Sequence, residues 1–241
     1  ALNKFVFDIP KLITNVTPII IEGEQIISKK SVENTIFERF KDIPYLNRIE
    51  VVKQSLFSQV ENKYLSSKDN SHFDYVEDKK TFYDFCKAQV DAQVDAMIKT
   101  LDSVDIYKLL WSNIEKYTNM DLNSTKELTL NYLNNNEVKF EDITPIIYIR
   151  SSLEGFRSYG NMKHVLIDEA QDYSPLFYKI IKRSFPNASL TIMGDLNQRI
   201  DKHSNVKNRS SITNIFNDVK TVVLTKSYRS TGNITNFTKD I

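Results

Sequence analysis

The chain has 241 residues, of which 41% are apolar or aromatic and 26% are charged, so it can bury a sizeable core and is not a disordered segment. Its formal net charge of +1 gives no global sign of a nucleic-acid binder. The single cysteine, Cys86, excludes a disulfide framework and predicts a reducing, cytoplasmic location, and the longest apolar runs are too short to span a membrane.

Residues 1–140 are predicted to be mostly helical. The exception is Pro18–Ser28, whose pattern predicts two short strands around a Glu-Gly-Glu turn. Apolar residues recur at helical spacing over Leu46–Ser66, which predicts an amphipathic helix. A long helix is predicted from about Glu77 to Leu101, and Ser124–Glu127 has the pattern of a capping box for a further helix.

Four aspartates of the predicted 77–101 helix and its end would share one face, because steps of seven and four residues return to the same side of a helix. They are Asp84, Asp91, Asp95 and Asp102. The surrounding segment, 69–105, holds nine acidic residues against four lysines. We interpret this stripe as a partner-binding surface for a basic molecule; a solvated helix face is the alternative.

From residue 141 the pattern changes to alternating helices and strands. A helix over Glu141–Leu153, with Ile143, Ile146, Ile147 and Leu153 facing inward, comes first. The elements predicted after it are a strand at 164–168, a helix at 175–185, a strand at 189–193, a helix near 210–217, a strand at 220–224 and a helix from about 231. Ser174 and Pro175 fit the cap and first position of the 175–185 helix.

This alternation predicts an α/β fold with two domains. Residues 1–140 would form a mostly helical insert domain with a short β-hairpin. Residues 141–241 would form a partial parallel sheet with helices on both faces. The net charge divides at the same point, −3 before residue 141 and +4 from there on.

Acidic residues follow two of the predicted strands directly. Asp168 and Glu169 come after one apolar run and Asp195 after the next. The carboxyl ends of parallel strands meet at one edge of a sheet, where ligands bind. Carboxylates at such an edge commonly hold hydrated Mg²⁺ and orient a water molecule toward a nucleotide phosphate.

Three motifs occur in order: LIDEAQD at 166–172, IMGDLNQ at 192–198 and LTKSYRST at 224–231. Their order and spacing resemble the UvrD/Rep-like branch of superfamily 1 helicases. Within that branch, DEAQDYSP and GDLNQ are most similar to the HelD proteins, which act on RNA polymerase. The resemblance covers about 160–241 well, whereas 1–140 matches only in its placement, as an insert in the first RecA-like lobe.

The resemblance implies ATP and Mg²⁺ as cofactors and a role for each motif residue. Asp168 would hold Mg²⁺ through water, and Glu169 would orient and deprotonate the attacking water. Gln198 would sense the γ-phosphate, and Arg229 would offset the charge that develops on it. The remaining nucleotide-site residues would be Gln171, Asp172, Gly194, Asp195 and Tyr228, with Tyr228 stacking on the adenine.

Two departures from the family pattern stand out. The phosphate loop GxxxxGK[ST] is absent, since none of the five glycines precedes a lysine. We therefore expect a fragment of a larger motor that is inactive by itself. Arg199–His203, directly after GDLNQ, contains no aromatic residue to stack on bases, so only weak binding of nucleic acid through phosphates is expected.

The leading hypothesis is a fragment of a HelD-like motor that uses ATP hydrolysis to release RNA polymerase from nucleic acid. A DNA helicase of the helicase IV or UvrD kind is the main alternative. A third hypothesis is a non-catalytic docking module with vestigial motifs. A metal-dependent nuclease using Asp168, Glu169 and Asp195 is the fourth, but it leaves Gln198 and Arg229 unexplained.

Overall fold

The computed structural model describes residues 1–65, 76–195 and 210–224. Its contacts divide the chain into two compact units, 1–165 with 183–189 and 166–182 with 190–241. It is a mixed α/β structure, as the sequence predicts. The predicted domain boundary at residue 140 differs from the boundary between these units and remains a prediction. In the part of the chain that the structure describes, no helix is long and apolar enough to cross a membrane.

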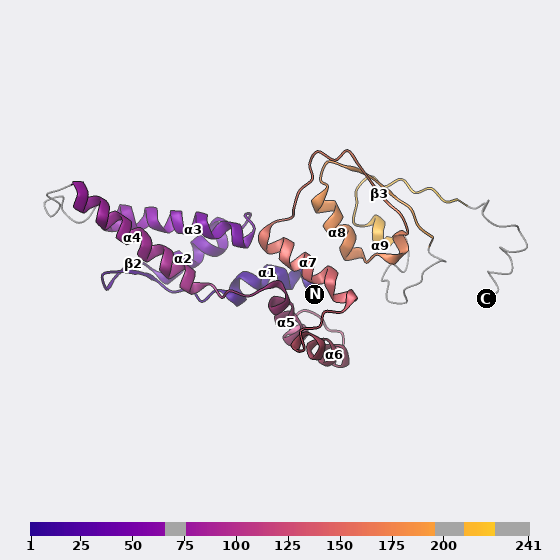
Figure 1. The fold of residues 1–241 in the computed structure, drawn as a ribbon, viewed down its shortest axis with the longest axis horizontal. Coiled ribbons are helices and arrows are strands. Elements are labelled where there is room, and N and C mark those ends of the chain that lie inside the picture. Colours follow the sequence, from indigo (N-terminus) through magenta and orange to yellow (C-terminus); the bar gives the residue numbers. More distant parts are fainter. Residues whose placement is uncertain (66–75, 196–209, 225–241) are drawn as a thin grey trace, which may run out of the picture. The chain divides into compact units, whose positions relative to one another are not determined.

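The first unit is built mainly from helices. Its helices are α1 (Leu2–Ile13), α2 (Lys29–Asn34), α3 (Tyr45–Val60), α4 (Val76–Met97), α5 (Ser103–Ser112), α6 (Asn123–Asn134) and α7 (Phe140–Glu154). Short π-helical turns, Thr35–Arg39 and Glu61–Leu65, follow α2 and α3. Figure 1 shows α3 and α4 lying side by side as a long helical pair. The core between them is apolar, with Val52, Leu56, Cys86 and Val90 fully buried.

The predicted hairpin is confirmed as β1 (Ile19–Ile21) and β2 (Glu24–Ile27), which pair antiparallel. The turn residues Glu22 and Gly23 both have positive φ, as a tight two-residue hairpin turn requires. Ile20 faces outward, and the side-chain amide of Gln93 on α4 bonds to both of its backbone groups, at 2.9 and 2.7 Å. The edge of β1 is therefore covered by a side chain instead of another strand.

The acidic stripe predicted along the 77–101 helix forms only in part, because three of its four aspartates lie on α4 and the fourth lies beyond its end. Helix α4 ends at Met97 because the next residues pair with the end of α1: Asn15 N–H donates to Met97 O at 2.7 Å and Lys99 N–H to Ile13 O at 2.8 Å. Asp102 lies beyond the helix and caps α5, accepting from the backbone N–H groups of Val104 and Asp105.

The three remaining aspartates differ in their surroundings. Asp95 forms a 2.8 Å ion pair with Lys53 on α3, Asp91 is half-buried, and Asp84 is exposed. The predicted shared helix face is therefore wrong for Asp102, whereas Asp84, Asp91 and Asp95 all lie on α4. Binding of a partner by these residues remains a prediction.

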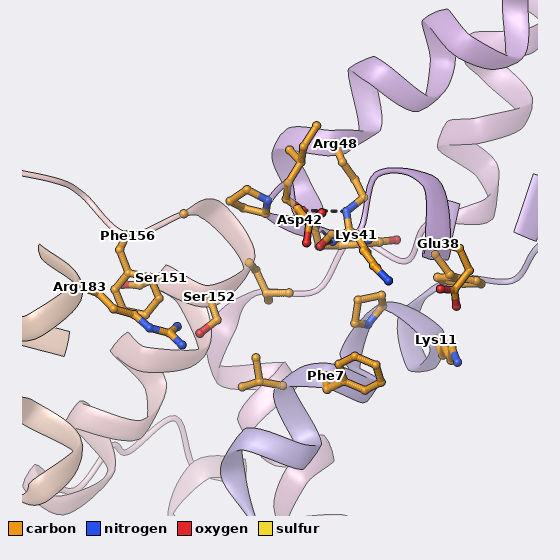
Figure 2. Close-up of a pocket in the computed structure, with 18 residues that line it drawn as sticks. Phe7, Lys11, Glu38, Lys41, Asp42, Arg48, Ser151, Ser152, Phe156 and Arg183 are labelled. Carbon is orange, nitrogen blue, oxygen red and sulfur yellow. Dashed lines mark hydrogen bonds between the residues drawn. The ribbon is translucent and has the colours of Figure 1, made fainter. Parts of the chain in front are cut away.

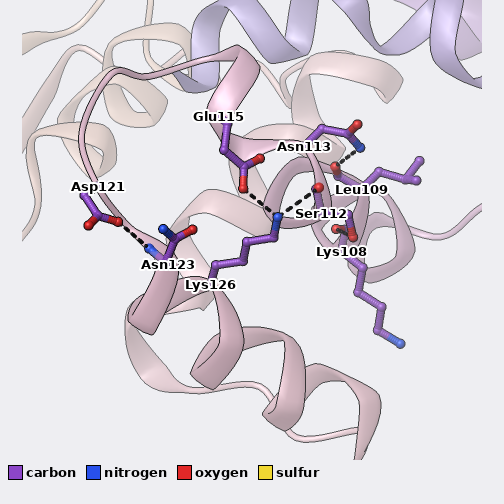
Figure 3. Close-up of polar contacts among 8 residues, drawn as sticks. All are labelled: Lys108, Leu109, Ser112, Asn113, Glu115, Asp121, Asn123 and Lys126. Atoms are coloured by element: carbon purple, nitrogen blue, oxygen red, sulfur yellow. Dashed lines mark hydrogen bonds and ion pairs between the residues drawn. The ribbon is translucent and has the colours of Figure 1, made fainter.

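Helix α6 begins one residue before the predicted capping box, so Ser124 lies inside the helix and does not cap it. Asp121 instead accepts a hydrogen bond from Asn123 N–H at 3.2 Å. Lys126 joins the start of α6 to the end of α5, donating to Ser112 O at 3.2 Å and to Glu115 at 2.6 Å (Figure 3). This hydrogen bond holds the pKa of Glu115 below its ordinary value.

Helix α7 is confirmed, and its inner face agrees with the prediction only at Leu153, which is buried, and at Ile146, which packs against the core. Tyr148, Ile149 and Leu153 are buried, whereas Ile143 and Ile147 are 42% and 45% exposed. The helix has apolar residues on both sides, so sequence periodicity could not select the buried one. Gly155 ends it with φ 94°, in the left-handed region that favours glycine.

The predicted pair of parallel strands is confirmed. They are β3 (His164–Ile167) and β4 (Ser189–Ile192), joined through α8 (Pro175–Ser184). Ser189 N–H donates to Lys163 O and Met193 N–H to Ile167 O, a constant offset that makes the pair parallel. Ser174 caps α8 through Phe177 N–H at 3.3 Å, as predicted.

The C-terminal predictions hold less well. The helix near 210–217 is shortened to α9 (Ser210–Thr213), and the predicted 220–224 strand is absent. Val222 and Leu224 are 71% and 89% exposed, because no strand in the described part of the chain lies alongside them. An apolar run becomes a strand only when a neighbouring strand binds its backbone. The predicted helix from 231 lies outside the described residues.

Candidate functional site

The acidic motif forms a tight turn at the carboxyl end of β3. Glu169 has φ 48° and ψ 45°, a left-handed conformation that costs a residue with a side chain about 1–2 kcal/mol. The turn is held by Glu169 N–H, which donates to Asp168 Oδ1 at 2.9 Å, and by Asp172 N–H, which donates to Glu169 O at 3.0 Å. As a result, Asp168 and Glu169 are both exposed directly after a buried strand residue, Ile167.

Gln171 connects this turn to the second motif. Its side chain is almost completely buried, with 2% of the residue exposed. Its Nε2 donates to Glu169 Oε2 at 2.7 Å, and its Oε1 accepts from Asp195 N–H at 3.0 Å. One amide therefore binds a carboxylate of the first motif and the backbone of the second.

Gly194 passes too close to the first motif for any side chain. A Cβ at this position would lie 2.6 Å from Gln171 Oε1 and 2.9 Å from the Cβ and N atoms of Ala170. The backbones are also bonded directly, because Ala170 N–H donates to Met193 O at 2.9 Å. Glycine is needed here so that the two motifs can meet. The predicted contact of Gly194 with a nucleotide remains a prediction.

Tyr178 on α8 stabilises the turn by a hydrogen bond to its backbone, a role that the sequence did not predict. It is fully buried, and its hydroxyl donates to Ala170 O at 2.8 Å. Burial, with contributions from nearby Tyr173 and Asp172, raises the pKa of Tyr178, so its hydroxyl stays a neutral donor. The signal available in the sequence was its place on the inner face of an amphipathic helix.

Asp172 has a carboxylate oxygen whose hydrogen bonding is incomplete. Its Oδ1 is buried and has no hydrogen-bond partner among the described residues. Nearly all buried polar atoms in folded proteins have one. The predicted role of Asp172, to tie the motif to its neighbours, remains a prediction.

The carboxylates fit a magnesium ion that is held mainly by water and phosphate. Among the described residues, no group of three His, Cys, Asp or Glu side chains could hold a metal ion by itself. Mg²⁺ in nucleotide sites is usually bound by one or two carboxylates with waters and substrate phosphates. Exposed Asp168 suits that arrangement. The nuclease hypothesis requires a ligand cluster, and Glu169 Oε2 is already bonded to Gln171.

The structure thus brings together six predicted nucleotide-site residues: Asp168, Glu169, Gln171, Asp172, Gly194 and Asp195. The other three, Gln198, Tyr228 and Arg229, lie outside the described residues.

A separate pocket of about 530 Å³ lies in the first unit, and no motif residue lines it. Figure 2 shows Arg183 beside Phe156 at one end, with Lys41, Glu38 and Lys11 toward the other. The guanidinium of Arg183 stacks on two rings, 4.7 Å from the centre of Phe156 and 5.6 Å from that of Tyr148. The pocket mixes cations with the carboxylates of Glu38 and Asp42.

Comparisons with known proteins agree with the motifs. Residues 21–211 match the model of the UvrD/REP helicase N-terminal domain. The chain is 32% identical over 105 residues to the ATP-dependent DNA helicase Rep of Buchnera aphidicola, covering 41% of this chain and 16% of Rep. It is 26% identical over 136 residues to the ATP-dependent DNA helicase srs2 of Schizosaccharomyces pombe, covering 55% of this chain and 13% of srs2.

The aligned regions thus span less than a fifth of either relative. The family match, in contrast, extends over most of the chain and includes both the acidic turn and the Gly194 contact. The chain belongs to the UvrD/REP helicase family of superfamily 1.

Proposed function

We propose that this chain is part of an ATP-driven superfamily 1 motor that acts on DNA. Residues 141–241 would belong to its first RecA-like lobe and 1–140 to an insert. The observation that carries the proposal is the Gln171 amide, which binds Glu169 and Asp195 together. Both relatives are ATP-dependent DNA helicases by name, which supports DNA as the polymer.

The proposed chemistry divides between the two carboxylates of the turn. Bound Mg²⁺ would neutralise charge on the nucleotide phosphates, and Asp168 would hold its water shell. Glu169 would orient a water molecule and accept its proton through Oε1, since Oε2 accepts from Gln171. Gln198, Tyr228 and Arg229 would complete the site as γ-phosphate sensor, adenine platform and arginine finger.

The test is Glu169→Gln in the protein that carries this chain. Nucleotide binding should persist, while steady-state ATP turnover should fall at least ~100-fold, the usual scale for a positioned acid or base. Glu154→Gln is the matched control, because Glu154 is an exposed glutamate that pairs with Arg150 in the other unit. Undiminished turnover in Glu169→Gln would overturn the assignment.

The 241 residues alone should neither bind ATP tightly nor hydrolyse it, because they contain no phosphate loop. Vigorous hydrolysis by this chain in isolation would contradict its proposed place in a larger motor.

Release of RNA polymerase is the second candidate function. It is favoured by the similarity of DEAQDYSP to HelD proteins and by the excess of five negative charges over 69–105, which suits a basic surface. Charge reversal at Asp84 and Asp91 tests it best, since Asp95 is engaged with Lys53 and Asp102 caps α5.

The double variant should lose binding to core RNA polymerase in a titration, with circular dichroism as the folding control. Glu127→Lys, an exposed acid on α6, is the matched variant and should bind normally. Equal binding by the double variant would leave the DNA motor as the better proposal.

A further inference from the structure

The position of Gln171 suggests more than a structural link between two motifs. Its amide group makes two bonds that depend on each other, because both are made by one rigid planar group. Nε2 reaches Glu169 at 2.7 Å and Oε1 is reached by Asp195 N–H at 3.0 Å. A shift of the Asp195 backbone must therefore rotate the amide or break one bond.

The surroundings leave this amide little freedom to respond in any other way. Gln171 is 2% exposed, so no bulk water can replace a lost partner. Gly194 lies against Oε1 without room for a Cβ, and the neighbouring Ala170 N–H is fixed to Met193 O. Displacement of residues 194–195 is thus passed to the amide, and from the amide to Glu169.

We propose that Gln171 is a positioning residue that sets the orientation of the Glu169 carboxylate according to the position of the Gly194–Asp195 backbone. This inference rests on the proposed function, in which Glu169 accepts the proton of the attacking water. Residues 194–195 begin the GDLNQ motif, so a phosphate-driven movement there would align Glu169 for hydrolysis. Without that movement, Oε2 stays held by the amide in its present direction.

The primary test is Gln171→Met in the protein that carries this chain, because methionine has a similar shape and makes neither bond. We expect kcat for ATP to fall about 10- to 100-fold, the range for a positioning contact to a catalytic base, with KM changed less than about threefold. The same change in a Glu169→Gln background should have no further effect on kcat, since Gln171 acts through Glu169. Additive losses would show a merely structural role and overturn the inference.

Gly194→Ala tests the same amide by placing a methyl group against its oxygen atom. Its Cβ would displace Gln171 Oε1, so it should reproduce the loss in kcat and not add to that of Gln171→Met. Gly160→Ala is the control: its Cβ would meet Asn187 Nδ2 at an ordinary 3.6 Å. Normal turnover in Gly194→Ala would contradict the proposed coupling.

A measurement without nucleotide separates this inference from the proposed function. Hydrogen exchange at the Asp195 amide should be at least tenfold faster in Gln171→Met, because its acceptor is gone, and unchanged in Gly160→Ala. If the wild-type protein hydrolyses no ATP, the proposed function fails. If it does hydrolyse ATP while Gln171→Met keeps full kcat and normal Asp195 exchange, this inference fails alone.

Discussion

The hydroxyl of Tyr107 on α5 donates a 2.6 Å hydrogen bond to the carboxylate of Asp142 on α7, and both residues are buried. Burial raises the pKa of Asp142 despite this bond, and burial together with the bond raises that of Tyr107. Folding therefore disfavours the charged form of Asp142, which lies at the contact between α5 and α7.

This pair makes the stability of the first unit depend on pH. The folded-state pKa of Asp142 lies above the ordinary 3.8. The stability that protonated Asp142 contributes is therefore fully present below pH 3.8 and is lost as pH rises through the raised pKa. Asp142→Asn keeps an acceptor for Tyr107 and does not ionise. Urea unfolding at a series of pH values checks this. The unfolding free energy of Asp142→Asn should equal or exceed that of the wild type at neutral pH, and it should fall less between acidic and neutral pH.

Tyr107→Phe is the complementary change. It leaves the Asp142 carboxylate buried without its donor and should cost about 1–3 kcal/mol of unfolding free energy at neutral pH. If the unfolding free energies of the wild type and Asp142→Asn change equally with pH, Asp142 is not the group that makes the stability depend on pH.

Arg48 should be essential for the structure of the first unit. Its guanidinium is buried and donates to the carbonyl oxygens of Ile36, Lys41 and Ile43 at 2.7–3.1 Å. Arg48→Met leaves three carbonyls without a donor and should lower the unfolding free energy by about 3–5 kcal/mol. Arg48→Lys should restore only part of this loss, because an ammonium group cannot reproduce the planar fork.

Arg39→Met is the matched control for Arg48. Arg39 is exposed and makes one bond to Ser55 Oγ at 3.1 Å, so its loss should cost about 0.5 kcal/mol or less. Thermal and urea unfolding of both variants would check the difference. A similar cost at the two positions would contradict the role given to Arg48.

Gly155 should resist substitution for a conformational reason. With φ 94° and ψ 143° it occupies a region that is almost restricted to glycine, and an added Cβ would meet Pro44 Cγ at 3.3 Å. Gly155→Ala should cost about 1–3 kcal/mol of unfolding free energy. Gly160→Ala should be neutral or slightly stabilising, since alanine restricts the unfolded chain. Comparable stability of the two variants would argue against this account.

Single-stranded nucleic acid should bind the chain weakly and mainly through phosphates. The net charge is +1, and the sequence Arg199–His203 contains no Phe, Tyr or Trp. Fluorescence anisotropy should show an affinity that falls steeply as salt is raised, because phosphate contacts release counterions. Tight binding that persists at high salt would instead indicate base stacking elsewhere on the chain.

The sequence determined those elements whose burial follows a local period. The hairpin around Gly23, helix α3 and strands β3 and β4 all appear near their predicted positions. In the hairpin and in α3 one face is buried, and this leaves a regular pattern in the chain. Strands β3 and β4 are only partly buried, and the signal for them was a short apolar run followed by acidic residues. The motif residues were recognisable because Asp168, Glu169 and Gln171 lie within four consecutive residues.

Tertiary contacts decided what the local pattern could not. Helix α4 ends where its backbone pairs with Ile13–Asn15, and the 220–224 run stays irregular without a strand beside it in the described part of the chain. Gln171 contacts Gly194, and Tyr178 contacts Ala170, only because β3, β4 and α8 fold together. A hydrogen bond or a close approach between distant residues has no period in the sequence. The residue types were therefore predictable, whereas their connections required the folded chain.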